Sequence, residues 1–428
     1  MGAANFRYLC SHTWSRLPHI GRQLLLSTTV MTRRYIPFFA RRIFFALFFG
    51  LIFIGFAGCS SEKDEPGPIP GTNFRRTVLL YMAADNNLGS NNYDSSDLTE
   101  LRNAVQAGAL GSDAAVVVYH SRYGMAPVLT RITSAGSDTL MRFDRGTTAV
   151  SASRMEDVIA LTRRHAPADK YGLVVWGHAT GWLQDGIADD RTNYSFGPDG
   201  GSKMNISTLA SVLEDAACFD YVYFDCCYMA SVETVYELRR TCDYIVGSAT
   251  ELPAGGMNYS ANLALLADGS RDALIESARN TFEMYNAKTG SSRTCTMAVV
   301  DTDALDALAE ATRAVYEHVE SSMPKGYTPQ RFTGYGTECR YFDFYDYIEN
   351  LGAPAAKLEA WKDAFGRAVL YSANTPFLWA SVDLGRHHGL STYIIREEAN
   401  LGDRNYRSLQ WYSDVASALP ATALLPTF

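Results

Sequence analysis

Strand-length apolar runs alternate with helix-length amphipathic segments from residue 76 onward, and this alternation constrains the fold more than any other feature. The runs TVLLYMA (77–83), AAVVVYH (114–120) and YGLVVWG (171–177) show no apolar–polar alternation. Strands of that kind are buried on both faces, as in parallel sheets that are covered by helices on each side. The sequence therefore predicts an α/β fold in which a mainly parallel sheet lies between two layers of helices.

The segments between these runs have the pattern of helices. Helices are expected over 97–108, 153–164, 206–217 and 232–241. Ser153 lies three residues before Glu156, which is the spacing of a capping box, so the second helix is expected to begin there. The short runs PVLTRI and TLMRF are expected to form a small antiparallel pair.

After about residue 290 the pattern changes, and the first domain is expected to end there. TCTMAVV, FLWASVD and GLSTYII are expected to be strands, and EAWKDAFGRAVLYS (359–372) is expected to be a helix. The sequence predicts a domain over 76–290 that is followed by a smaller C-terminal subdomain over 291–428. An extension of the same sheet would fit the late strands equally well.

The N-terminus carries an export signal. Residues 43–58 form an apolar run preceded by Arg33, Arg34, Arg41 and Arg42, and they end in FAGC. The segment resembles a bacterial lipoprotein signal peptide (1–58) with Cys59 as the lipidated residue and 59–75 as a flexible linker. Met31 is a candidate for the true start. We expect a protein tethered to a bacterial envelope membrane on its periplasmic or cell-surface side, and the alternative is an uncleaved membrane anchor.

Composition excludes several classes of protein. The net charge is -8, and no stretch of the sequence is rich in Lys and Arg, so a surface that binds nucleic acid is not expected. Eight cysteines are present, and six remain once Cys10 and Cys59 are set aside. Six cysteines without a CxxC motif indicate neither a disulfide scaffold nor a zinc site.

The stretch YVYFDCCYMAS (221–231) holds the first chemical candidates. Side chains alternate along a strand, so Cys226 joins the apolar face of Val222 and Phe224, whereas Cys227 shares its side with Asp225. The dipole of the helix expected next would favour a Cys227 thiolate, and the Asp225 carboxylate would oppose it. The residues alone leave open whether Cys227 is reactive or only a buried strand cysteine.

A nucleophilic thiol needs a base within reach. His178 follows the strand LVVWG and lies 49 residues before Cys227, close to the separation in the caspase signature. His120 ends the run VVVYH and is a competing base. No GxSxG or HExxH motif supports a serine or metal hydrolase.

Four blocks in order then suggest a family. RTVLLYMAADNNL (76–88), VVWGHATGW (174–182), YFDCCYMASVETVYEL (223–238) and SATELPAGGMNY (248–259) resemble the successive blocks of the clostripain-like cysteine peptidases. The resemblance implies a caspase-like three-layer sandwich and a Cys–His dyad that hydrolyses peptide bonds. It selects Cys227 as the nucleophile and His178 as the base, and it gives His120 no role.

The resemblance also implies a substrate site. Backbone N–H groups near Cys227 and around Gly177–Ala179 would hold the oxyanion, and loss of one such donor costs about 3–4 kcal/mol of barrier. Substrate-binding roles are implied for Asp225, Gly177, Ala179, Ser248 and Glu251, with cleavage after Arg or Lys. Ala179 replaces a family glycine, and Gly255 stands where the family has an acid. Both departures favour the alternative of an inactive peptidase fold that acts as a binding module.

Other implied properties concern the loop after His178. Autoprocessing could occur at Arg191 or Lys203, and a calcium requirement is open, with Asp185, Asp189, Asp190 and Asp199 as hard oxygen ligands. A solvated surface loop explains the same residues. The chemistry itself needs no cofactor, the substrates would be proteins or peptides, and the chain is expected to be a monomer.

Overall fold

The computed structural model describes residues 73–183, 195–319, 324, 326–333, 339–395 and 401–420. The predicted signal peptide, Cys59, Arg191, and the aspartates 185, 189 and 190 lie outside these residues. Within the described ranges, no helix is both long enough and apolar enough to cross a membrane.

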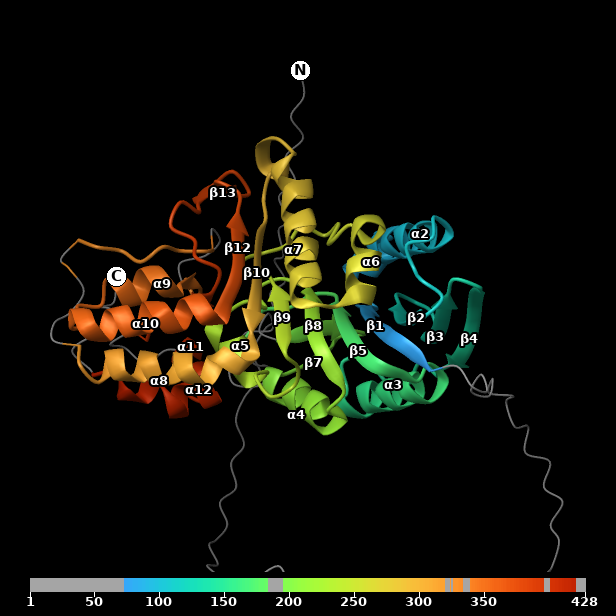
Figure 1. The fold of residues 1–428 in the computed structure, drawn as a ribbon, viewed down its shortest axis with the longest axis horizontal. Helices are drawn as coiled ribbons and strands as arrows, with labels where there is room; N and C mark the ends of the chain where they lie inside the picture. Colours follow the sequence, from blue (N-terminus) through green and yellow to red (C-terminus); the bar gives the residue numbers. More distant parts are fainter. Residues whose placement is uncertain are drawn as a thin grey trace, which may run out of the picture. The chain divides into compact units, whose positions relative to one another are not determined.

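A nine-stranded sheet forms the centre of the fold, in the order β12-β10-β9-β8-β5-β1-β2-β3-β4 (Figure 1). The five central strands β2, β1, β5, β8 and β9 are parallel, and the strands at both edges run antiparallel. The predicted parallel sheet is confirmed, with antiparallel additions. The strands are β1 (Phe74–Ala84), β2 (Ala114–Arg122), β3 (Val128–Thr133), β4 (Gly136–Arg142), β5 (Ala168–Trp176), β8 (Phe219–Asp225), β9 (Tyr244–Gly247), β10 (Thr296–Asp301) and β12 (Val369–Asn374).

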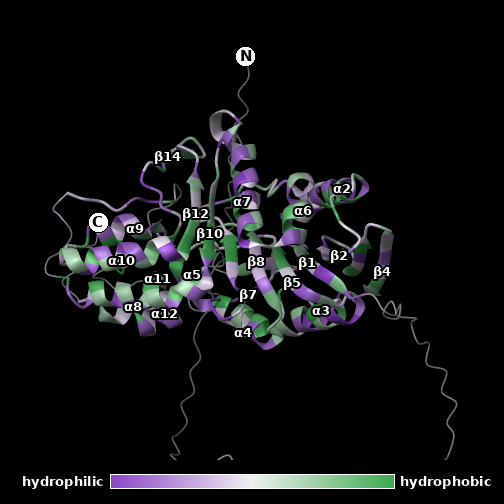
Figure 2. Ribbon diagram, in the orientation of Figure 1, coloured by the Kyte–Doolittle hydropathy of each residue, from purple (hydrophilic) through white to green (hydrophobic). Residues whose placement is uncertain are grey.

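Two layers of helices cover the sheet, so the predicted three-layer α/β sandwich is confirmed. One face packs against α3 (Ala152–His165), α4 (Ile206–Ala216), α5 (Val232–Glu237), α8 (Leu305–Tyr316) and α10 (Ala355–Ala368). The other face packs against α2 (Tyr93–Gln106), α6 (Tyr259–Asp268) and α7 (Arg271–Asn286). Figure 2 shows the consequence: the central strands are largely hydrophobic, whereas helices such as α3 and α8 carry hydrophobic and hydrophilic residues on different sides.

The pleat of β8 divides its side chains between the two cores. Val222, Phe224 and Cys226 belong to the core under α3 and α4, whereas Tyr221 and Tyr223 belong to the core under α6 and α7. The alternation inferred from the sequence is therefore present. It directs Cys226 into one apolar core, while Cys227, one residue further along, packs at the boundary of both.

The late part of the chain extends the same sheet through β10 and β12. The helix predicted over 359–372 is wrong in its last residues, because Val369–Asn374 pairs with β10 as β12 after α10 ends at Ala368. The predicted strand FLWASVD is a hairpin of β13 (Phe377–Leu378) and β14 (Val382–Asp383). GLSTYII contributes only β15 (Ser391–Thr392), which pairs with β11 (Phe342–Asp343). The boundary at residue 290 stays a prediction.

The order of the parallel strands reverses at β1, which lies between β2 and β5 although both follow it in the chain. In open α/β sheets, ligands bind at the carboxyl ends of the strands, next to such a reversal. This edge of the sheet is where the chain places His178, directly after β5, and Cys227, directly after β8.

The N-cap of helix α3 lies two residues before the predicted one. Ser151 is its N-cap, with extended backbone angles and a hydroxyl that accepts the Arg154 N–H at 3.2 Å. Ser153 is an exposed residue inside the first turn, so the predicted capping box with Glu156 is wrong. The preceding Ala149 and Val150 are buried in the core, and this anchoring fixes where the chain can enter the helix.

This assignment predicts different costs for the two serines. Ser151→Ala should lower the free energy of unfolding by about 1 kcal/mol because the Arg154 N–H loses its acceptor. Ser153→Ala should change it by no more than a few tenths of a kcal/mol, since alanine is a good helix former. Urea denaturation of both variants measures the difference, and equal losses would contradict the assigned cap.

Candidate active site

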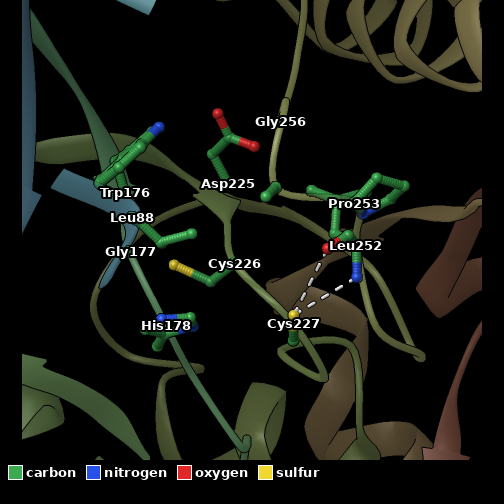
Figure 3. A pocket seen from close by; sticks show the side chains of 11 residues that line it. Leu88, Trp176, Gly177, His178, Asp225, Cys226, Cys227, Leu252, Pro253 and Gly256 are labelled. Atoms are coloured by element: carbon green, nitrogen blue, oxygen red, sulfur yellow. Dashed lines mark hydrogen bonds between the residues drawn. The ribbon is translucent and has the colours of Figure 1, made fainter. Parts of the chain in front are cut away.

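A cavity of about 90 Å³ opens at the carboxyl ends of β5, β8 and β9, beside the short helix α1 (Asn87–Ser90) (Figure 3). Four of the residues expected to act in catalysis or substrate binding line this one cavity: Gly177, His178, Asp225 and Cys227. The remaining lining residues are Leu88, Trp176, Cys226, Leu252, Pro253, Ala254 and Gly256. The topology thus brings together residues that come from four separate segments of the chain.

The Cys227 thiol is held by the backbone of Leu252. Its sulfur donates to the Leu252 carbonyl at 3.6 Å and accepts the Leu252 N–H at 3.4 Å, as Figure 3 shows. Burial raises the pKa of this thiol to about 12, and the charges of Glu251 and Asp225 act in the same direction. The sequence predicts that the dipole of the following helix favours the thiolate and that the Asp225 carboxylate opposes it, and in this resting arrangement burial and the opposing charges dominate. The helix α5 begins only at Val232 and spans six residues.

Cys226 is a core residue. Its side chain is 2% exposed, and its thiol donates to the Val175 carbonyl on the neighbouring strand at 3.2 Å. Burial raises the pKa of this thiol well above its usual range. All six cysteines of the described chain are free thiols, so no disulfide joins Cys226 to Cys227 or to Cys218.

Asn87 orients the His178 imidazole. The His178 Nε2 lies 2.6 Å from the Asn87 side-chain oxygen, and because an amide oxygen can only accept, Nε2 carries the proton. The other nitrogen, Nδ1, is then the basic one. Burial lowers the pKa of His178, so the ring is neutral near pH 7, as a general base must be. Among the described residues no hydrogen bond joins His178 to Cys227, so the two groups share a cavity without being engaged.

The Asp225 carboxylate is buried under the cavity. It accepts the Met257 N–H and the Tyr259 hydroxyl, each at 3.1 Å, and Figure 3 shows it between Trp176 and Gly256. Burial raises its pKa to about 6. No Lys or Arg of the described residues forms an ion pair with it.

A second carboxyl group, Asp97 of α2, lies close to Asp225, and its pKa is raised to about 8, so it is mostly protonated at neutral pH. It is 2% exposed and accepts the indole N–H of Trp176 at 2.7 Å. Burial raises the pKa of Asp97, and the nearby Asp225 charge raises it further. The sequence has Gly255 in place of a family acid, and Gly255 is exposed and does not line the cavity. Asp97 was not identified from the sequence.

Two glycines allow the close contacts of the cavity. Gly256 has a φ of +51°, and a Cβ atom there would lie 2.5 Å from the Asp225 carboxylate. Gly177 has a φ of +149°, and its N–H makes a long contact of 3.5 Å with the Asp225 carbonyl and also faces the Cys226 sulfur. The Gly177 N–H is therefore only weakly engaged at the wall of the cavity.

Three other residues expected at the substrate site lie outside the cavity lining. Ala179 is buried in the apolar core, so its methyl group does not crowd the cavity. Ser248 is buried and shares a hydrogen bond of 2.8 Å with Thr296. Glu251 accepts the Tyr228 hydroxyl at 3.2 Å and the indole N–H of Trp379. Their roles in substrate binding stay predictions.

The Tyr228 backbone fixes the bend that follows Cys227. Tyr228 has a φ of 60°, which is unfavourable for a residue other than glycine. Its ring stacks on Tyr341 at 4.3 Å, and its N–H donates to the Thr250 carbonyl at 2.9 Å. These contacts hold the strained backbone that turns the chain from β8 toward α5.

The remaining candidates lie elsewhere. His120 lies on β2, and its Nε2 is 2.6 Å from a carboxylate oxygen of the buried Asp94 on α2. It does not line the cavity. Lys203 belongs to the short strand β7 (Ser202–Met204). Asp199 is 1% exposed and its oxygens accept four hydrogen bonds. In the described chain, no group of three or more His, Cys, Asp or Glu side chains is placed to hold a metal ion.

Comparisons with known proteins agree with this geometry. A sequence profile of the clostripain family matches residues 80–408. The chain belongs to the clostripain family. It is accordingly a cysteine peptidase, its substrates are proteins or peptides, and its chemistry needs no cofactor.

Solved structures resemble the chain along most of its length. One is a secreted C11 cysteine protease from Bacteroides thetaiotaomicron bound to an irreversible peptide inhibitor, with 29% identity, a TM-score of 0.70, and coverage of 80% of this chain and 99% of that one. Another is an inactive zymogen C11 protease from Parabacteroides distasonis, with 27% identity, a TM-score of 0.67, and coverage of 81% and 99%. No match was found among curated protein sequences.

The hydrogen bond from Asn87 predicts a test of how His178 is oriented. Asn87→Ala should lower kcat about tenfold with little change in KM, because the imidazole loses the acceptor that fixes its tautomer. Steady-state kinetics on a short peptide substrate measure both constants. Asn103→Ala, at an exposed position of α2, is the control. An unchanged kcat in Asn87→Ala would show that Asn87 does not orient His178.

Proposed function

We propose that the chain is an endopeptidase that cleaves after Arg or Lys, with Cys227 as nucleophile, His178 as base and Asp225 as the group that binds the basic side chain. One observation carries this proposal: a single cavity holds a thiol, a neutral imidazole and a buried carboxylate without a cationic partner in the described chain. A buried charge without a partner is costly, so a ligand that supplies the cation is favoured.

The reaction follows from these roles. His178 Nδ1 takes the proton of the Cys227 thiol, and the sulfur attacks the carbonyl carbon to form a C–S bond. The Gly177 N–H is the proposed donor to the oxyanion, because its present contact is long. Collapse of the intermediate breaks the C–N bond, and the imidazolium gives its proton to the leaving amine. Water then hydrolyses the acyl-enzyme.

Substrate binding is proposed to help create the nucleophile. The negative charge of Asp225 is one of the causes that raise the pKa of Cys227. A guanidinium or ammonium group bound at Asp225 cancels that charge and therefore favours the thiolate. The thiol must also leave the Leu252 backbone before it can reach His178. Catalysis would then be coupled to occupation of the cavity by a basic side chain.

Export, anchoring and processing complete the proposal. The lipoprotein-like segment supports anchoring through Cys59, and the secreted relatives are consistent with export. Autoprocessing is proposed at Arg191 or Lys203, and a calcium requirement stays a prediction for the loop after His178. A monomer is sufficient for the site, since every proposed group comes from one chain.

The alternative function, an inactive peptidase fold that acts as a binding module, is disfavoured because the thiol, base and carboxylate share one cavity.

Two adjacent cysteines allow a direct test of the nucleophile. Cys227→Ala should lower hydrolysis of an Arg-aminocoumarin peptide by at least about a thousandfold, because the covalent step is lost. Cys226→Ala should keep most of the activity, since that thiol lies in the core. Purified proteins are assayed under reducing conditions. Activity that survives in Cys227→Ala would refute the assigned role.

The raised pKa of Asp225 predicts a pH dependence of substrate binding. Asp225 becomes charged as the pH rises through about 6, so the KM for an Arg substrate should fall over that interval and level off above it. Asp225→Asn should remove this change and lower kcat/KM for Arg and Lys by about a hundredfold or more. Steady-state kinetics from pH 5 to pH 8 provide the measurement. A KM that varies equally in both proteins would exclude Asp225 as the binding group.

A further inference from the structure

A second cavity, of about 170 Å³, opens at the same edge of the sheet beside the ends of β1 and β2. Its walls include Asp85, Ser121, Met125, Arg145, Thr148 and Gly200. One of its wall residues, Asp199, was considered from the sequence as a calcium ligand, and the proposed reaction assigns the cavity no role.

The walls of this cavity are joined by the buried Asp199 of β6 (Phe196–Asp199). Its carboxylate accepts the Asp85 and Ala149 N–H groups at 3.0 and 2.9 Å, and the Ser121 and Thr148 hydroxyls at 3.0 and 3.1 Å. The Gly200 N–H donates in turn to the Asp85 carbonyl at 2.9 Å. The turn between β6 and β7 is thus fixed to β1, β2 and the segment before α3, so the cavity is formed in advance.

Two short connections link these walls to His178. From β1, Asn87 lies two residues after Asp85 and bonds the His178 imidazole at 2.6 Å. From β6, the Gly197 N–H donates to the His178 carbonyl at 3.0 Å, two residues before Asp199. The base of the proposed dyad therefore stands between the two cavities.

The direction in which the substrate peptide must run places the second cavity next to the part of the substrate that follows the scissile bond. The basic side chain before the cut enters the first cavity, at the ends of β5, β8 and β9, and the leaving amine takes its proton from His178 at β5. The leaving peptide then continues over β1 and β2. Neighbouring strands are about 4.8 Å apart, so β2 lies roughly 10 Å from β5, which about three extended residues span.

Arg145 is the one cationic residue that lines this cavity, and Asp85 and Asp199 are its two carboxylates. Arg145 is exposed and forms no ion pair or hydrogen bond with the described residues, whereas Asp199 has its oxygens occupied. Asp85 also faces the cavity, and its carboxylate already accepts the Gly124 N–H at 3.3 Å. At the rim, Met125 and the nearby Tyr123 are each 58% exposed, and they are two of only four large apolar side chains exposed in the described residues.

We propose that the second cavity is a leaving-side subsite in which Arg145 binds an acidic side chain two or three residues after the scissile bond. The proposal rests on the proposed endopeptidase function and adds a second determinant of its substrate choice. Cut sites would then combine a basic residue before the bond with an acidic residue shortly after it.

Internally quenched peptides that share one sequence up to the cut test this subsite. They carry Glu, Ala or Lys at the second or third position after the bond, and an Arg-aminocoumarin substrate has no residue there. Wild-type kcat/KM should favour Glu over Lys by about tenfold, the size expected for one hydrogen bond to a charged group. Arg145→Glu should reverse this preference and leave the aminocoumarin rate unchanged, which also shows that the variant folds.

Arg240→Glu is the matched control, because Arg240 is exposed just before β9 at the opposite edge of the sheet. It should leave every rate unchanged. An identical preference in wild type and Arg145→Glu, or a wild-type preference for Lys, would overturn the subsite. Failure to cleave the aminocoumarin substrate would instead refute the basic specificity, so the two proposals fail in distinguishable ways.

Discussion

The burial of the Asp225 carboxylate at the end of β8 is the constraint on which the rest of the site depends. Two donors, Met257 and Tyr259, compensate the charge only in part, and Asp97 adds a second acid nearby. The fold can hold this arrangement because Gly256 brings backbone directly against the carboxylate. A buried carboxylate without a cationic partner favours a ligand that supplies a cation, and this supports the proposed cleavage after Arg or Lys.

The same negative charge disfavours the thiolate of Cys227, the proposed nucleophile. Cys227 is half-buried, bonded to the Leu252 backbone and close enough to Asp225 and Glu251 for both charges to disfavour the thiolate. His178 is neutral and bonded to Asn87. An enzyme with these properties has little reactive thiolate in the absence of substrate, which suits a peptidase that must not cleave indiscriminately.

Rules that apply within a single strand, such as the alternation of side chains, predicted some residues of the site. The pleat separates Cys226 from Cys227, and the position after a buried strand gave His178. Asn87, Asp97 and the Leu252 backbone were missed because each acts through contacts between segments distant in the sequence. Asn87 did carry a signal, since it is a polar residue just after β1, the strand next to β5.

The errors in the fold have a similar origin. The residues 369–374 have a helical pattern, but pairing with β10 makes them a strand, so tertiary contacts outweigh local preference. Ser153 has the spacing of a cap, but the burial of Ala149 and Val150 starts the helix at Ser151. The sequence could not predict where the methyl group of Ala179 points. The structure shows that it packs in the apolar core and not in the cavity.

The coupling between the Asp225 charge and the Cys227 thiol is tested most directly by alkylation. The rate at which iodoacetamide modifies Cys227 is measured by mass spectrometry across pH, with and without saturating methylguanidine. The account predicts slow modification at neutral pH in the free protein and a clear acceleration with methylguanidine, which Asp225→Asn abolishes. A thiol that reacts rapidly at neutral pH without the cation, or whose rate the cation leaves unchanged, would contradict it.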